Sequence, residues 1–172
     1  PKITFTKLPN EYQGTTSSGG KNGTSVSVDD SQANYLDVDG FGRSKLDFGF
    51  QVTDVPSAQY QCKVYIDQNQ DGKFEEGLAD VDGSGDADDS DDTGEVYYEG
   101  DVFTAGDGEQ NITPVKLSRL YFGLIQWKIV VYRKDNPDIH FTRTGCSVAK
   151  NQTGQKRVIK VLQIMPDTDT NN

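Results

Sequence analysis

The chain consists mainly of short segments in which apolar and polar residues alternate. The clearest example is Lys45–Val55, in which every second side chain is apolar (Leu46, Phe48, Phe50, Val52). Helical periodicity is almost absent from the rest of the chain. Because successive side chains of a strand point to opposite faces, this alternation requires sheets with one buried face. The sequence therefore predicts an all-β fold.

Turns rich in Gly, Asn, Asp and Pro separate the strand-like segments. These segments are 3–8, 24–28, 35–38, 45–55, 59–66, 95–104, 112–120, 124–132, 139–143 and 157–164. The pattern is weakest in 24–28 and 35–38, so we expect about eight or nine strands. Short strands at this spacing favour an immunoglobulin-like β-sandwich. Trp127, the single tryptophan, is expected to anchor its core.

The 172 residues correspond to about one domain. We expect an N-terminal strand and a flexible connection over 1–30, a β-sandwich domain over 31–166 with an acidic insertion at 67–92, and a polar tail over 167–172. The chain begins abruptly at Pro1 and ends in polar residues. We therefore expect it to be a piece of a longer protein.

The charge of the chain is concentrated in one segment. Between Asp67 and Glu109, sixteen acids stand against one base, Lys73, which gives −15; the remaining 11 acids and 16 bases give +5. So many anions repel phosphate backbones, and we expect no nucleic-acid partner. There is no run of eighteen or more apolar residues, so we expect no membrane insertion of this segment.

The densest part of this charge runs from Asp67 to Asp92 and contains eleven carboxylates. Such a group must be neutralised by water or by bound cations. Oxygen ligands at odd-numbered positions around a glycine turn are what calcium selects in proteins. We therefore expect a calcium-binding loop insertion. The alternative is a solvated acidic linker, because Asp/Gly/Ser-rich segments are common in linkers.

The first match to the calcium-loop template begins at Asp67. The template places ligands at positions 1, 3, 5, 7, 9 and 12, with a glycine at position 6. The first five ligands and the turn are Asp67, Asn69, Asp71, the Lys73 carbonyl, Glu75 and Gly72. Position 12 is Leu78, so Glu76 or Asp80 would have to supply the last carboxylate by a changed loop path.

A second match begins at Asp80. Its ligands are Asp80, Asp82, Ser84, the Asp86 carbonyl, Asp88 and Asp91, with Gly85 at the turn. The two frames adjoin, so shared carboxylates could hold a pair of calcium ions. We expect the role of this calcium to be structural, because an ordered insertion otherwise costs conformational entropy.

The sequence offers little for catalysis. With His140 as the single histidine, no Ser/His/Asp or Cys/His set can be assembled. A carboxylate pair for glycoside hydrolysis stays open because acids abound. However, Asp47 and Asp54 flank strand residues, where outward-facing or turn positions are expected. We therefore expect no enzymatic activity, and His140 is expected on the surface of a strand.

The two cysteines, Cys62 and Cys146, leave two alternatives open. They could form a bridge between the sheets of a secreted sandwich. They could also be two small, buried, unpaired thiols.

Two resemblances rest on short motifs. Tyr65–Glu76 (YIDQNQDGKFEE) resembles the calcium loops of dockerins. Lys63–Phe74, Gly123–Asn136 and Lys160–Pro166 (KVLQIMP) resemble an uncharacterised family, a domain of unknown function, of large Gram-positive cell-surface proteins. In that family the last strand leads into a following α/β domain, and the resemblance implies a boundary there. It implies no activity that can be carried over.

Together these features predict a non-catalytic, calcium-binding, extracellular β-sandwich module of a larger bacterial surface protein, acting as spacer, scaffold or adhesion domain. Its partners would be calcium ions and a glycan or protein of the cell surface. One alternative is a carbohydrate-binding module, with Tyr97, Tyr98, Tyr121 and Phe122 as candidates for a sugar-stacking platform. Another is an accessory domain of an enzyme whose catalytic part lies beyond Pro166.

Overall fold

The computed structural model describes residues 1–12, 24–27, 34–40, 43–67, 74, 96–116, 123–149, 158–161 and 169–171. Within these residues the chain is all-β, with eleven strands and no helix. The strands are β1 (Lys2–Lys7), β2 (Thr24–Ser27), β3 (Lys45–Thr53), β4 (Gln59–Ile66), β5 (Val96–Glu99), β6 (Phe103–Thr104), β7 (Gln110–Lys116), β8 (Gly123–Arg133), β9 (His140–Ala149), β10 (Val158–Val161) and β11 (Asp169–Asn171). The predicted all-β class is confirmed.

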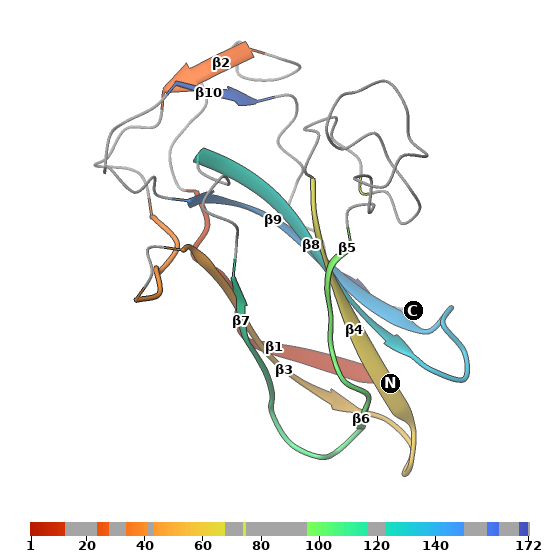
Figure 1. The fold of residues 1–172 in the computed structure, drawn as a ribbon. Helices are drawn as coiled ribbons and strands as arrows, with labels where there is room; N and C mark the ends of the chain where they lie inside the picture. Colours follow the sequence, from red (N-terminus) through yellow and green to blue (C-terminus); the bar gives the residue numbers. More distant parts are fainter. Residues whose placement is uncertain are drawn as a thin grey trace, which may run out of the picture.

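Two antiparallel sheets form the two layers of a sandwich (Figure 1). The first has the order β1-β3-β7, and the second has the order β11-β9-β8-β4-β5, with β6 also pairing with β4. A separate pair is formed by β10 and β2. None of the described residues forms a helix long and apolar enough to cross a membrane.

The core lies between the two sheets and follows the alternation of the sequence. From the first sheet β3 contributes its even-numbered side chains, and from the second sheet β4 and β8 contribute every second one. The largest fully buried side chains of this core are Leu46, Phe48, Phe50, Tyr60, Val64, Ile66, Trp127, Ile129 and Phe141; Tyr65 is also buried, but on the other face of β4. Phe48 of β3 meets Trp127 of β8 edge to face, with ring centroids 5.3 Å apart. Trp127 therefore joins the two layers, as predicted for a core anchor.

The lack of a side chain at Gly145 of β9 leaves room for the ring of Trp127 in β8. The two residues are directly opposite each other in the β8–β9 register. A Cβ atom on Gly145 would lie 2.2 Å from a carbon of the Trp127 ring. The indole N–H of Trp127 donates to Ser147 Oγ at 2.9 Å, so its polar atom is satisfied inside the core. Only a residue without a side chain fits opposite this ring.

Three predicted segments have different limits in the structure. Residues 35–38 form isolated bridges rather than a strand, one of them between Tyr35 and Val148. The segment 95–104 is divided into β5 and β6 near Gly100, whose Cβ would lie 2.7 Å from the Sγ atom of Cys62. β9 continues beyond Arg143 to Ala149 and pairs with β8 throughout. β11 lies within 169–171, in the stretch expected as a polar tail, and pairs with β9.

The two cysteines are buried and free, which agrees with the second of the two alternatives, a pair of unpaired thiols. Both are neighbours of β8, where Cys62 is opposite Val131 and Cys146 is opposite Gln126. Five residues of strand separate these positions by about 16 Å, whereas the Cα atoms of a disulfide lie within about 7 Å. Burial raises the pKa of each thiol to about 12, so both stay protonated and unreactive at neutral pH.

Candidate functional site

The acidic insertion starts from the rigid end of β4. Asp67 follows the last residue of this strand, Ile66, which is opposite Trp127 in β8. The backbone N–H of Asp67 donates to the Gln126 carbonyl at 3.1 Å, which extends the β4–β8 pairing by one bond. Asp67 is only 6% exposed. The first position of the calcium template is therefore held in place by the sheet.

Phe74, seven residues further along, lies at the same end of the sheet. Its ring centroid is 6.3 Å from that of Tyr65 in β4, in an edge-to-face arrangement. The Lys128 Nζ of β8 lies 4.5 Å from the centroid of the Tyr65 ring and 5.4 Å from that of Phe74. Positions 1 and 8 of the first template frame are thus both anchored to the end of β4 and β8.

The other predicted ligands lie outside the described residues. They are Asn69, Asp71, Lys73, Glu75, Asp80, Asp82, Ser84, Asp86, Asp88 and Asp91. Among the residues that the structure describes, no group of three or more His, Cys, Asp or Glu side chains could hold a metal ion. Asp67 is the one predicted calcium ligand that lies within the described residues, so the fit to calcium can be tested only at this residue. A buried carboxylate needs a cation or hydrogen-bond donors beside it, and its oxygen is the ligand type that calcium prefers.

Asp47, which lies within β3 and is buried, and Asp54, which follows this strand, both take part in ion pairs. Asp47 lies 3.3 Å from the Lys7 ammonium, and its side chain is 8% exposed. Asp54, in the turn after β3, accepts hydrogen bonds from the Tyr60 hydroxyl at 2.6 Å and the Arg133 guanidinium at 3.2 Å. The Tyr60 hydrogen bond, above all, lowers the pKa of Asp54; burial opposes this, and the Val55 N–H and Arg133 support it. A carboxyl group with a lowered pKa is a poor general acid at neutral pH.

Removal of the Tyr60 hydroxyl is expected to show the strength of this bond. Tyr60→Phe should reduce the free energy of unfolding at pH 7 by about 1.5 kcal/mol, because a charge-assisted hydrogen bond is lost. The pKa of Asp54 is lowered in the folded state, so its contribution is complete above the unfolded value of about 3.9 and is lost as the pH falls below it. The difference between the two proteins should therefore shrink in that acidic range when denaturant unfolding is measured against pH.

Tyr132→Phe is the matched control, because the Tyr132 hydroxyl donates to the neutral Gln61 amide at 3.0 Å. Its cost should not change over the same pH range. An equal cost of Tyr60→Phe at pH 7 and at pH 2 would contradict the role given to Asp54.

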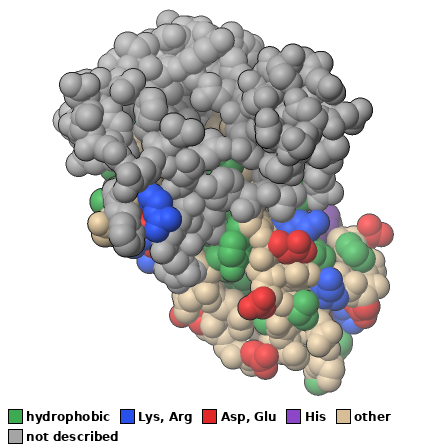
Figure 2. Space-filling view, in the orientation of Figure 1, with side chains coloured by type: hydrophobic (Ala, Val, Ile, Leu, Met, Phe, Trp, Pro, Cys, Tyr) green, Lys and Arg blue, Asp and Glu red, His purple; other side chains and the backbone are tan. Residues whose placement is uncertain are grey.

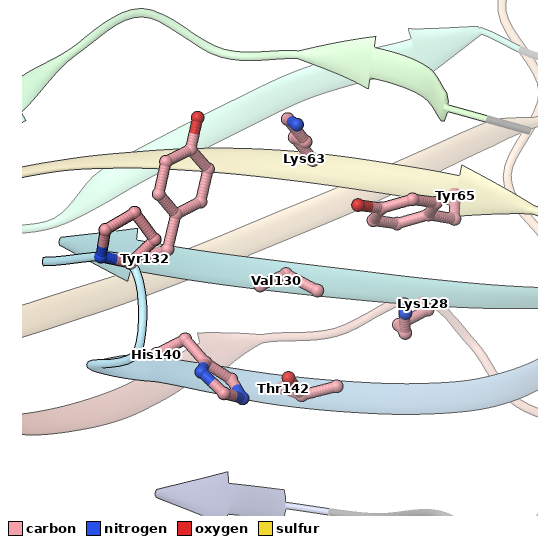
Figure 3. A pocket seen from close by; sticks show the side chains of 8 residues that line it. Lys63, Tyr65, Lys128, Val130, Tyr132, His140 and Thr142 are labelled. Atoms are coloured by element: carbon pink, nitrogen blue, oxygen red, sulfur yellow. The ribbon is translucent and has the colours of Figure 1, made fainter. Parts of the chain in front are cut away.

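A trough lies on the outer face of the second sheet, beside the start of the insertion (Figure 3). Its volume is about 410 Å³. Its strand residues lie in three cross-strand rows, Tyr65–Lys128, Lys63–Val130–Thr142 and Tyr132–His140. The residues that line it, called the cationic trough below, are Lys63, Tyr65, Lys128, Val130, Tyr132, Pro137, His140 and Thr142.

Among the described residues that line the cationic trough, the charged side chains are basic. Two ammonium groups and a histidine are among the eight lining residues, and none of the eight is an acid. Elsewhere on the described surface in Figure 2, acidic and basic side chains are interspersed. Glu99 of β5 is opposite Lys63 of β4, so an acidic residue adjoins this lining.

Sequence reasoning did not find this trough. Of the four aromatic residues expected for a sugar platform, Tyr98 is 37% exposed. The side chain of Tyr97, and Tyr121 and Phe122, lie outside what the structure describes. The trough instead uses Tyr65 and Tyr132, which occupy the polar face of β4 and β8 together with lysines. The available signal was that Lys63 and Tyr65 of β4, and Lys128 and Tyr132 of β8, share the strand face opposite the predicted core.

Comparison with models of protein families, with curated proteins and with solved structures gave no match for this chain.

Proposed function

We propose that the chain is a non-catalytic, extracellular β-sandwich module whose acidic insertion is ordered by calcium, and that it acts as a spacer, scaffold or adhesion domain in a larger bacterial surface protein. The observation that carries this proposal is the anchoring of Asp67 and Phe74 at the same end of β4 and β8. A flexible acidic linker has no need of a buried first carboxylate or of an aromatic residue packed on the sheet. A calcium loop needs its ends held close together, because its ligands converge on one ion.

The arrangement of strands supports an immunoglobulin-like topology for this module. β1, β3 and β7 in one sheet correspond in order to strands A, B and E of that fold. β9, β8, β4 and β5 in the other correspond to G, F, C and the additional strand beside C. Such a sandwich has its two ends free for loops, and the acidic insertion leaves from one of these ends, between C and the strand beside it.

Tryptic cleavage tests the proposed ordering directly. Lys73 is the single base between Asp67 and Glu109, so cleavage after Lys73 reports on the first template frame alone. Calcium is expected to slow this cleavage about tenfold or more relative to chelator, because a bound ion removes the open conformations that a protease needs. Fragment masses identify the cut. Magnesium is the matched control, since it prefers a smaller octahedral site. Equal cleavage rates in calcium, magnesium and chelator would rule out calcium ordering.

A further inference from the structure

We propose that Asp107, in the turn between β6 and β7, is a site of covalent self-modification, at which the aspartate converts spontaneously to isoaspartate. The chain contains four Asp–Gly pairs, and two of them, Asp39–Gly40 and Asp107–Gly108, lie within the described residues. The same dipeptide thus stands in two different surroundings, so the structure decides which of the two reacts. This inference assigns a modification site outside the acidic insertion, and it does not depend on calcium.

The reaction needs no molecule other than water. The backbone nitrogen of the glycine attacks the side-chain carboxyl carbon of the preceding aspartate, and a C–N bond forms. The amide proton and the hydroxyl of the carboxyl group leave together as water, which gives a succinimide ring. Water then adds to the ring carbonyl that came from the main chain, and the C–N bond to that carbonyl breaks. The main chain now continues through the former side chain, so the net reaction is an isomerisation.

The attacking nitrogen is equally available in the two pairs. Among the described residues, no group accepts a hydrogen bond from the N–H of Gly40 or of Gly108. Nothing lies within 4 Å of the position that a Cβ would take on either glycine, so no neighbouring atom blocks the approach. The difference between the two pairs must therefore come from the carboxyl group.

The carboxyl group of Asp39 is held at both oxygens. Its Oδ1 accepts the backbone N–H of Arg43 at 2.9 Å, and its Oδ2 accepts the Nε–H of the same residue at 2.9 Å. The side chain is only 10% exposed, and the bond to the guanidinium is charge-assisted. Both bonds must break before the glycine nitrogen can reach the carboxyl carbon, so this pair is protected.

The carboxyl group of Asp107 is exposed and is held by one long bond. Its Oδ2 accepts the backbone N–H of Thr104 at 3.3 Å, and this contact lies at the surface. Asp107 and Gly108 are both exposed, so water reaches the succinimide ring. The carboxyl group can therefore turn toward the nitrogen of Gly108 at the cost of one weak hydrogen bond.

The turn that contains Asp107 connects the two sheets. β6 pairs with β4 in the second sheet, and β7 pairs with β3 in the first. The Ala105 N–H donates to the Ala58 carbonyl at 2.8 Å, and the Gly106 N–H donates to the Val52 carbonyl at 2.9 Å. Isoaspartate adds one carbon to the main chain directly after these bonds and before β7. The added length therefore weakens the attachment of β7 to the turn.

Ageing of the folded protein at neutral pH tests the proposal. Isoaspartate is measured at each position by peptide mass spectrometry after digestion with endoproteinase Asp-N, which does not cleave before isoaspartate. We expect the product to form at Asp107 at least about tenfold faster than at Asp39, because local structure protects the second carboxyl group. In guanidinium chloride the two rates should agree within about twofold, because this protection is lost with the fold.

Three variants test the role of each carboxyl group. Asp107→Glu keeps the charge but cannot close a five-membered ring, so it should form no isomer at this position. Asp107→Asn should react several-fold faster than Asp107, because ammonia leaves more readily than water and the ring is the same. Arg43→Gln removes the guanidinium from Asp39, and it should raise the rate at Asp39 several-fold while leaving the rate at Asp107 unchanged.

Equal rates at Asp39 and Asp107 in the folded protein, or no isoaspartate at Asp107, overturn the proposal. An unchanged rate at Asp39 in Arg43→Gln overturns the protection assigned to that guanidinium. The isoaspartate form should melt about 2–4 °C below the Asp107→Glu protein aged in parallel, the effect of losing about one hydrogen bond of the turn. An equal melting temperature would contradict the weakened attachment of β7.

Discussion

Replacement of Gly145 by alanine is expected to lower the free energy of unfolding by about 3 kcal/mol. The added Cβ would lie 2.2 Å from a carbon of the Trp127 ring. The ring cannot move aside easily, because it is fully buried, packs on Phe48 and donates its N–H to Ser147. A glycine-to-alanine change in a strand would otherwise stabilise the fold by about 0.5–1 kcal/mol. The sign of the effect therefore reports the steric conflict of the added Cβ with the Trp127 ring and with the Glu11 carboxylate 2.5 Å from it, and urea denaturation measures it.

Two further variants isolate this conflict. Gly40→Ala is the matched control, because nothing lies within 4 Å of the Cβ it would add. It should leave the midpoint of unfolding nearly unchanged. Trp127→Ala should cost about 3–5 kcal/mol. In that background Gly145→Ala should cost less than in the unaltered chain, because the ring is gone and only the end of the Glu11 side chain, 2.5 Å from the added Cβ, still has to move. Additive costs of the two substitutions would contradict the close packing of Gly145 on Trp127.

Chelation of calcium is expected to lower the melting temperature by about 10 °C. An ion present at a thousandfold excess over its dissociation constant stabilises the folded state by about 4 kcal/mol, and each kcal/mol shifts the midpoint of a domain of this size by about 2–4 °C. Differential scanning calorimetry in calcium and in chelator measures this shift. Asp67→Asn should abolish most of it, because Asp67 provides the first ligand from the rigid end of β4.

Asp101→Asn serves as the control for the loss of one charge, since Asp101 is exposed and lies outside the predicted calcium frames. Its protein should show the same calcium-dependent shift as the unaltered chain. Two results would contradict the assignment of Asp67 as a calcium ligand. One is an equal melting temperature in calcium and in chelator, and the other is an undiminished calcium-dependent shift in Asp67→Asn.

The bounds of a strand could be predicted from the sequence where burial of one face alone decides which residues alternate. Gln59–Ile66 was predicted residue for residue, because its even-numbered side chains all enter the core. β9 was predicted too short, because its core-facing positions after Phe141 are Arg143, Gly145 and Ser147 rather than apolar residues. Those residues are set by the partner strand, since Gly145 makes room for Trp127 and Ser147 accepts its N–H. A pattern read along one strand does not contain such requirements of its neighbour.

The two candidate sites also differ in how far the sequence alone could predict them. The calcium template is a local motif, so Asp67 could be proposed from spacing alone. The packing of Phe74 on Tyr65 and the burial of Asp67 depend on the register of β4 with β8, which spacing does not provide. The cationic trough draws its residues from three strands and the turn before β9. Its residues are brought together only by the cross-strand register, so the sequence showed them as ordinary polar-face positions.

The central claim is that the acidic insertion binds calcium, and its most direct test is a calorimetric titration of chelator-stripped protein with calcium, repeated on Asp71→Ala. Our account predicts one or two saturable sites, with binding at least about tenfold weaker in the variant, because the fifth position of the template loses its carboxylate. Absence of binding heat, together with an unchanged melting temperature, would contradict the account and identify the stretch from Asp67 to Asp92 as a solvated acidic segment.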